Sequence, residues 1–322
     1  MDEHFSSPEF QDFPISLHLD MIRDPVRMEL YSEAIKSIVD SGSRVIDIGS
    51  GTGILSLIAA QHGAEKVCGV EISSLARYAT KIAELNSLED MVEFIQGNIL
   101  EIEPPAEKFT IAICELFGTF GIDENILPIL QHVREKFLEE GGKILPESLE
   151  LFVAPVQCTE SYRNIANWKP KMFGLDFSPV QELAYNAVYH LSGDPVRLLA
   201  NQKELAAINF YSVAKLPHRR VLEYQFETDG VLHGMVGWFT STLAPGYVLS
   251  TSPKQESTHW GQLFFPIGNP VKIKKGGRIE FQFNECFEAN LCHWNWQGGI
   301  FPDVNSRKKI TYSYNATRNF ES

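Results

Sequence analysis

With 322 residues, the chain is long enough to form two domains, and 44% hydrophobic residues suffice to fill two cores. Its net charge of −13, from 41 acidic and 28 basic side chains, disfavours nucleic-acid binding and favours basic partners. No apolar run approaches the ~18 residues of a membrane span, so no membrane contact is expected. Five scattered cysteines, an odd number, indicate reduced thiols and a cytoplasmic location, which extends to the nucleus if the source is eukaryotic.

The first 28 residues are interpreted as an N-terminal arm that covers a bound cofactor. Apolar residues recur at helical spacing from Val26 to Val39, and Pro25 suits a first helical turn. A helix is therefore predicted there, and a Rossmann-like domain is expected over residues 29–146.

A short strand, a glycine turn and a helix follow from residue 43. The turn reads Asp47-Ile-Gly49-Ser-Gly51-Thr-Gly53, and its glycines let the backbone approach a ligand. A dinucleotide site would have Gly-x-Gly-x-x-Gly, whereas Gly-x-Gly-x-Gly after an acidic residue suits the amino-acid end of S-adenosylmethionine. The sequence therefore favours that cofactor.

The next two strands add to this cofactor site. The second strand ends at Glu71, eighteen residues after Gly53, near the distance at which a carboxylate meets a ribose diol. The third strand, 91–96, is followed by a turn at Gly97, Asn98 and Ile99, where the adenine is expected.

A fourth strand, 109–114, ends at Glu115. In the usual winding of such sheets it lies beside the first strand, which puts Glu115 next to the glycine turn. Glu124 follows nine residues later, and the segment from Glu115 to Glu124 is here called the glutamate loop. Gly118 and Gly121 allow the chain to fold back within it. Two acids converging there would bind a cation; the plainer alternative is that Glu115 caps a helix and Glu124 is solvated.

The residue pattern changes in the second half of the chain, from alternating strands and helices to short strands. A helix is expected over 126–139, ended by the glycine pair at 141–142, and a strand then runs into Pro146. Beyond it, short strands separated by turn signals predict a mostly β, barrel-like substrate domain over 147–322. The predicted strands are 149–156, 209–214, 221–228, 234–242, 262–266, 278–284, 291–296 and 310–314.

Residues 161–199 interrupt the strands and are rich in Trp, Tyr, Phe and Pro. They are interpreted as a projecting arm that binds a second subunit, the alternative being an arm folded back on its own barrel. Cys286, Cys292 and His293 match no zinc spacing, so no metal is expected.

Together these motifs resemble the protein arginine methyltransferases over nearly the whole chain. The match rests on His18-x-x-Met21-x-x-Asp24-x-x-Arg27, the glycine turn, Gly-Val-Glu71, the Glu115 and Glu124 spacing, and Thr258-His259-Trp260. The resemblance implies a Rossmann-like domain, a β-barrel with an inserted dimerisation arm, and a head-to-tail homodimer with Pro146 at the domain junction.

The resemblance also implies roles for individual residues. The cofactor S-adenosylmethionine, which becomes S-adenosylhomocysteine, would be held by the N-terminal motif, the glycine turn and the acids that follow it, with Arg27 on the cofactor carboxylate. Glu115 and Glu124 would bind the guanidinium of an arginine in a protein or peptide, with Asp24 and His259 as a polar pair beside it. Met21 and Trp260 are expected to line the substrate site. The cofactor set is His18, Met21, Arg27, Asp47, Gly49, Gly51, Gly53, Glu71, Gly97, Asn98, Ile99 and Glu115.

The chain departs from the family pattern in places. The tyrosine pair that often precedes the His-x-x-Met motif is missing, and the glutamate loop opens as Cys114-Glu-Leu-Phe-Gly118, which looks more like monomethylating members. The number of methyl groups transferred is left open. Two alternatives also stand: methylation of a free guanidino or amino compound, and a catalytically silent scaffold that dimerises with a related enzyme.

Overall fold

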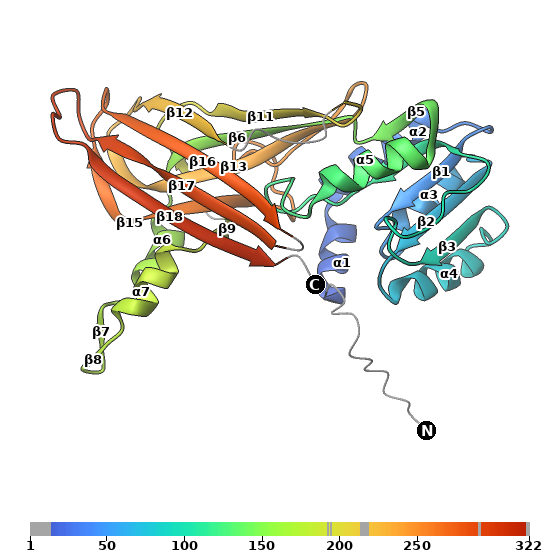
Figure 1. Cartoon of the computed structure of the whole chain (residues 1–322), viewed down its shortest axis with the longest axis horizontal. Coiled ribbons are helices and arrows are strands. Elements are labelled where there is room, and N and C mark those ends of the chain that lie inside the picture. The colour runs from blue at the N-terminus through green and yellow to red at the C-terminus, as the bar shows by residue number, and fades with distance from the viewer. Residues whose placement is uncertain (1–13, 192, 194, 213–218, 289–290, 320–322) are drawn as a thin grey trace.

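Two bodies of different secondary structure make up the molecule (Figure 1). A computed structural model describes residues 14–191, 193, 195–212, 219–288 and 291–319. The first body is a parallel sheet with helices, and the second is built mainly of long antiparallel strands, from which a short arm projects. None of the helices in the described ranges has the length and apolar character that a membrane span requires.

The first body is a five-stranded parallel sheet in the order β3-β2-β1-β4-β5. The strands β1 and β4 are buried almost throughout, as expected for a sheet that carries helices on both faces. The strands are β1 (Arg44–Ile48), β2 (Lys66–Glu71), β3 (Val92–Gln96), β4 (Phe109–Cys114) and β5 (Leu138–Leu145), and the helices are α3 (Ile54–Gln61), α4 (Leu75–Leu85) and α5 (Ile126–Lys136).

The register of this sheet brings the glycine turn and the glutamate loop together. Ile48, the last residue of β1, pairs with Cys114, the last residue of β4. The chain therefore leaves the sheet at Gly49 and at Glu115 side by side, and the predicted place of the fourth strand beside the first is confirmed.

The predicted end of the helix after the glutamate loop is wrong. The helix α5 ends at Lys136 rather than 139, and β5 begins at Leu138 and runs through the glycine pair. Gly141 has a φ of +79°, and the pairing of β4 with β5 shifts register between Phe109 and Ile111. The glycines thus serve an irregularity in a strand rather than a helix end.

Two helices precede the sheet. The helix α1 (Ile15–Arg23) was not predicted, and α2 (Pro25–Ile38) agrees with the expected helix. Asp24 caps α2 by accepting a hydrogen bond from the Arg27 amide at 3.1 Å, with Pro25 at the first helical position. Residues 1–13 of the predicted arm lie outside the described residues.

The second body, here called the β-domain, contains a seven-stranded and a four-stranded sheet. Its long strands β13, β15, β16 and β17 extend the predicted segments at one or both ends. The bounds are β6 (Ser148–Gln157), β9 (Tyr189–Leu191), β10 (Arg197–Leu198), β11 (Lys203–Asn209), β12 (Arg220–Gln225), β13 (Gly230–Ala244), β14 (Tyr247–Ser250), β15 (Gln262–Ile273), β16 (Arg278–Glu288), β17 (Leu291–Phe301) and β18 (Ile310–Asn319).

One predicted strand of the β-domain is displaced. The strand β11 ends at Asn209, where 209–214 was expected to begin, and it pairs with β6. Residues 210–212 form a turn, and 213–218 lie outside the described residues. Its residues Lys203–Asn209 read Lys-Glu-Leu-Ala-Ala-Ile-Asn, which has little of the β-branched character that marks a strand in sequence.

The projecting arm consists of α6 (Thr159–Ala166), a hairpin of β7 (Lys171–Met172) and β8 (Leu175–Asp176), and α7 (Ser178–Tyr185). The side chain of Tyr162 fixes its root, because the hydroxyl donates to the carbonyls of Ile267 and Gly268 and the ring stacks on His233 at 4.8 Å. The hairpin tip points away from the rest of the molecule (Figure 1).

Candidate active site

The glycine turn after β1, here called the cradle, lies at the carboxyl end of the central strand of the parallel sheet. Gly49, Gly51 and Gly53 all have positive φ, between +54° and +83°. A methyl group on Gly51 would lie 3.2 Å from the ring of His18, and one on Gly49 would lie 2.6 Å from Leu116. The turn therefore tolerates only glycine at these positions, and α1 covers it through His18.

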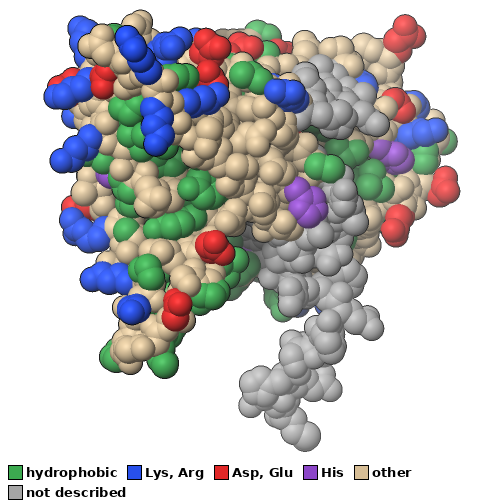
Figure 2. Space-filling model, turned by 60° about the vertical axis from the view of Figure 1, so that its left-hand side comes forward, with side chains coloured by type: hydrophobic (Ala, Val, Ile, Leu, Met, Phe, Trp, Pro, Cys, Tyr) green, Lys and Arg blue, Asp and Glu red, His purple; other side chains and the backbone are tan. Residues whose placement is uncertain are grey.

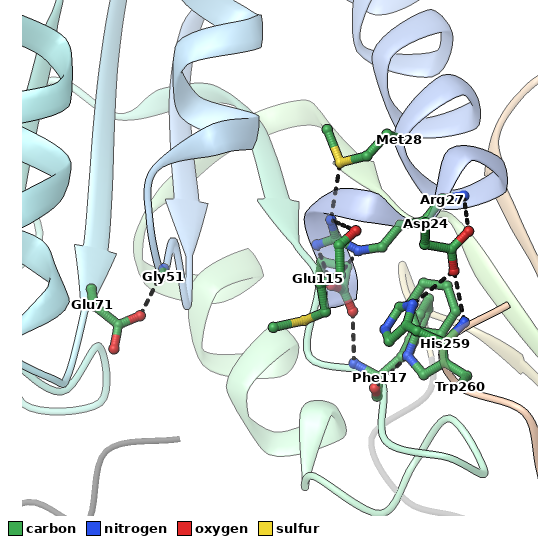
Figure 3. Close-up of polar contacts among 10 residues, drawn as sticks. Asp24, Arg27, Met28, Gly51, Glu71, Glu115, Phe117, His259 and Trp260 are labelled. Carbon is green, nitrogen blue, oxygen red and sulfur yellow. Dashed lines mark hydrogen bonds and ion pairs between the residues drawn. The ribbon is translucent and has the colours of Figure 1, made fainter. Parts of the chain in front are cut away.

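The carboxylate of Glu71 faces this turn (Figure 3). One of its oxygens accepts the Gly51 amide and the other accepts the Ser73 amide, both at 2.8 Å. Each carboxylate oxygen has a second lone pair, so Glu71 keeps the capacity to accept from a ribose hydroxyl. The Glu71 carbonyl accepts the Gly97 amide at 2.9 Å, which brings the segment of Gly97, Asn98 and Ile99 beside it. These groups fit the shape and polarity of S-adenosylmethionine.

The carboxyl of Asp47 lies behind the cradle rather than in it. It is 1% exposed and accepts from the Ser56 hydroxyl at 2.6 Å. Burial raises the pKa of Asp47 to about 6, although the Ser56 hydrogen bonds oppose the rise. We therefore expect Asp47 to support the cofactor site by tying β1 to α3.

The residue Glu115 meets Arg27 at the start of the glutamate loop (Figure 3). The Arg27 Nε and Nη2 atoms both donate to Glu115 Oε2, at 3.0 and 2.5 Å, and each side chain is only 6% exposed. The other oxygen of Glu115 accepts from the Phe117 amide at 3.3 Å. Burial would lower the pKa of Arg27, but the charge and hydrogen bonds of Glu115, together with smaller effects of Tyr31 and Asp24, outweigh it and raise the pKa, so Arg27 stays charged.

The third nitrogen of Arg27 has weaker partners. Its Nη1 atom lies 3.4 Å from the Met21 carbonyl and 3.3 Å from the Met28 sulfur. Both contacts are poor compared with a charged acceptor. This N–H group is therefore the part of Arg27 best placed to bind a cofactor carboxylate. Met28 was missed in the sequence, because a methionine on a helix reads as a packing residue.

The residues Asp24 and His259 form the predicted pair although they are 235 positions apart. Asp24 Oδ2 accepts from both the backbone amide and Nδ1 of His259, each at 2.8 Å. Burial would raise the pKa of Asp24, but the hydrogen bonds from His259 and the Arg27 amide outweigh it and lower the pKa. Asp24 is then ionised near neutrality and can only accept, so Nδ1 of His259 donates to it, and in the neutral form of the imidazole Nε2 carries the lone pair.

The indole of Trp260 binds the backbone of the glutamate loop. It is 4% exposed, its Nε1 donates to the Phe117 carbonyl at 2.8 Å, and its ring packs on His259 and Phe239 at 3.9 and 5.6 Å between centroids. The structure thus places Trp260 behind the loop, where it shapes the site, rather than at an open substrate surface.

The far end of the glutamate loop carries Glu124, which is half-buried. The loop makes a tight turn on the way to it, since Gly121 has a φ of +76° and its amide donates to the Gly118 carbonyl at 2.9 Å. The neighbouring Asp123 is fully buried and accepts the Phe120 amide at 2.9 Å. Sequence reasoning missed Asp123, which looked like one more solvated acid beside Glu124.

Three parts of the chain therefore converge on this site: the α1–α2 segment, the edge of the parallel sheet, and the loop before β15. They bring together Asp24, Arg27, Glu115, His259 and Trp260 through hydrogen bonds and ring contacts (Figure 3). A buried carboxylate that already binds one guanidinium, next to a cradle suited to S-adenosylmethionine, can bring a guanidinium and a methyl donor together.

Comparison with known proteins agrees with this geometry. Residues 39–192 match a methyltransferase domain, and residues 147–290 match the arginine methyltransferase oligomerization subdomain. The chain is 32% identical over 284 residues to protein arginine N-methyltransferase 6 of Danio rerio, covering 83% of this chain and 80% of that protein. It is 29% identical over 267 residues to protein arginine N-methyltransferase 1 of Dictyostelium discoideum, covering 81% and 78%.

Solved structures share the fold. The Trypanosoma brucei PRMT1 enzyme–prozyme heterotetrameric complex with AdoHcy has a TM-score of 0.83 at 24% identity, covering 93% of this chain and 98% of that chain. Arabidopsis thaliana protein arginine methyltransferase 10, in a uniquely open conformation, has a TM-score of 0.81 at 23% identity, covering 94% and 97%. With the sequence identity to the curated relatives over most of their length, these findings show that the chain belongs to the protein arginine N-methyltransferase family.

Proposed function

We propose that this S-adenosylmethionine-dependent protein arginine N-methyltransferase holds its substrate guanidinium between Glu115 and Glu124. The observation that carries the proposal is that Glu115 already binds a guanidinium, that of Arg27, in a buried setting. Planar guanidinium groups suit carboxylates because several N–H donors can meet one acid. Glu115 Oε1, held by the Phe117 amide, is the oxygen that remains for a second guanidinium.

Charge balance explains why a second acid is needed. Arg27, the sulfonium and α-ammonium groups of the cofactor, and the substrate guanidinium bring four positive charges together, and two unit charges ~4 Å apart repel by about 4 kcal/mol at an effective dielectric of ~20. Glu115, Glu124, Asp24 and the cofactor carboxylate supply four negative charges. Without Glu124 the site would carry one positive charge in excess whenever both ligands were bound.

Each acid also directs the reaction. By bonding two guanidinium nitrogens, Glu115 and Glu124 would draw positive charge toward them and leave electron density on the nitrogen that faces the methyl donor. Orientation of that nitrogen in line with the methyl–sulfur bond would supply much of the rate enhancement. The cofactor supplies the activated methyl group.

The residue His259 is proposed to carry away the proton that the methylated nitrogen loses. Its Nδ1 donates to Asp24, which leaves the Nε2 lone pair as the base. The indole of Trp260 packs against the imidazole of His259, with the two ring centroids 3.9 Å apart, and so restrains its orientation. Asp24 thus sets the tautomer and His259 moves the proton.

The test of the clamp is Glu124→Gln, with the exposed Glu140→Gln as a matched control. We expect Glu124→Gln to bind cofactor as the wild type does in calorimetry and to lose more than tenfold in turnover, while the control keeps both. Normal turnover in Glu124→Gln would remove the clamp from the mechanism. Mass spectrometry after reaction with an arginine-rich peptide and with free arginine separates the proposed substrate from a small molecule.

We also propose that the arm binds a second copy of the chain. Four large apolar side chains of the arm are 41–97% exposed, and Figure 2 shows hydrophobic side chains along this projection. An exposed apolar cluster of this kind on a projecting element is typical of an oligomer interface. The four are Trp168, Phe173, Leu175 and Leu183.

A further inference from the structure

The ring of Phe120, in the middle of the glutamate loop, lies between the two sheets of the β-domain. Its side chain is 0% exposed, and its ring centroid lies 5.7 Å from that of Phe265, 6.1 Å from that of Phe283 and 5.9 Å from that of Trp294. Phe265 belongs to the seven-stranded sheet, and Phe283 and Trp294 belong to the four-stranded sheet. A loop that starts at the parallel sheet therefore inserts an aromatic side chain into the core of the β-domain.

The β-domain makes room for this ring. Gly237 on β13 faces it, and a methyl group at Gly237 would lie 2.6 Å from the Phe120 ring. The two edge-to-face contacts, with interplanar angles of 69° and 86° to Phe265 and Phe283, are the arrangement that aromatic pairs prefer. The fit fixes both the depth and the direction of the ring.

The loop backbone is tied to the same residue. Asp123 accepts the Phe120 amide at 2.9 Å, and the Phe120 carbonyl accepts the Ile122 amide at 2.9 Å. Gly118 packs so closely on the Asp123 carboxylate that a side chain there would collide with it. Because Glu124 directly follows this compact turn, the placement of the Phe120 ring also sets the placement of Glu124.

We propose that Phe120 is a positioning residue, which holds Glu124 at the substrate guanidinium by anchoring the glutamate loop in the β-domain. This inference rests on the proposed clamp. Glu115 is held separately, by the end of β4 and by Arg27, so loss of the anchor moves one glutamate relative to the other. A displacement of about 1 Å in such a site can cost about a hundredfold in rate.

The first test replaces Phe120 by Ala and by Leu. The control is Phe281→Ala, which removes a fully buried ring that packs on Phe265 and Phe283 in the same aromatic core. We expect Phe120→Ala to lose tenfold or more in kcat with cofactor affinity unchanged, Phe120→Leu to recover part of the loss, and Phe281→Ala to stay within about threefold of wild type. Equal losses in Phe120→Ala and Phe281→Ala would overturn the proposal.

A second variant tests the anchor without touching the loop, in case Phe120→Ala does not fold. Gly237→Ala places a methyl group against the ring, so we expect a kcat loss with normal cofactor binding. The double variant of Gly237→Ala and Phe120→Ala should be less impaired than the two single losses multiplied, because the collision is gone. Wild-type kcat in Gly237→Ala would contradict the proposal.

Combination with Glu124→Gln separates this inference from the clamp. If Phe120 acts through Glu124, Phe120→Ala should lower kcat by less than twofold in the Glu124→Gln background. A further tenfold loss there would indicate general damage and overturn the positioning role. Unchanged turnover in Glu124→Gln alone would instead refute the clamp, whichever way the Phe120 variants behave.

Discussion

The replacement Arg27→Met tests how strongly the buried Arg27–Glu115 pair holds α2 against the parallel sheet. Methionine keeps much of the length but removes the charge, and it leaves the Glu115 carboxylate 94% buried without its cation. Breaking a buried pair from one side typically costs about 3–5 kcal/mol in the free energy of unfolding. At about 2 °C per kcal/mol for a long chain, the melting temperature should fall by about 6–10 °C.

The assay is a double-mutant cycle with Arg27→Met, Glu115→Gln and the double variant, followed by urea and thermal unfolding. The double variant should be more stable than Arg27→Met alone, since it no longer buries an unpaired carboxylate. The exposed pair of Lys274 and Asp229, with N and O 2.7 Å apart, provides the control: Lys274→Met should cost no more than about 1 kcal/mol. Additive losses at Arg27 and Glu115 would refute the claim that the two charges stabilise each other.

Three further predictions concern pH and assembly. The pKa of Asp47 is about 6 in the folded protein and 3.8 in the unfolded chain. Its contribution to the free energy of unfolding is therefore fully present below pH 3.8 and is lost as the pH rises through about 6. At 1.36 kcal/mol per pKa unit the loss is about 3 kcal/mol, and Asp47→Asn should flatten unfolding free energies measured from pH 4 to 7. Asp24 has a lowered pKa, so its contribution to stability is fully present above pH 3.8 and is lost on acidification through the folded pKa. Asp24→Asn should therefore destabilise the protein in urea at pH 7, and this effect should shrink progressively as the pH is lowered below 3.8. Phe173→Ser, at a 97% exposed position of the arm, should shift sedimentation toward a smaller species, and an unchanged species would exclude this part of the arm from the interface.

The order of the parallel sheet could be predicted because it depends on local patterns. Buried strands, a glycine turn and the usual winding are enough to place Glu115 beside Gly49, and the register of Ile48 with Cys114 confirms it. The glycine pair at 141–142 shows where the same reasoning fails. Two glycines are compatible with a helix end or with an irregular strand, and only the pairing of β5 with β4 decides between them.

Only some of the contacts between segments distant in the chain could be predicted from the sequence. The pairing of Asp24 with His259 was expected only through resemblance to a family, since nothing local in the sequence connects positions 235 residues apart. The ion pair of Arg27 with Glu115 was not predicted, because a motif indicates which ligand a residue binds but not its partners within the chain. The burial of Phe120 was likewise hidden, since a phenylalanine in a loop looks the same whether it is exposed or inserted into another body.

The glutamate loop is therefore defined by three supports that no single body provides. Arg27 of α2 holds Glu115, Trp260 of the β-domain holds the Phe117 carbonyl, and the aromatic core between the two β-sheets holds Phe120. The cradle around the glycine turn, by contrast, is made almost entirely by the parallel sheet and α1. Cofactor binding thus depends on the first body, whereas the spacing of the two glutamates depends on how both bodies pack. A change that loosens this packing should reduce methyl transfer before it reduces cofactor affinity.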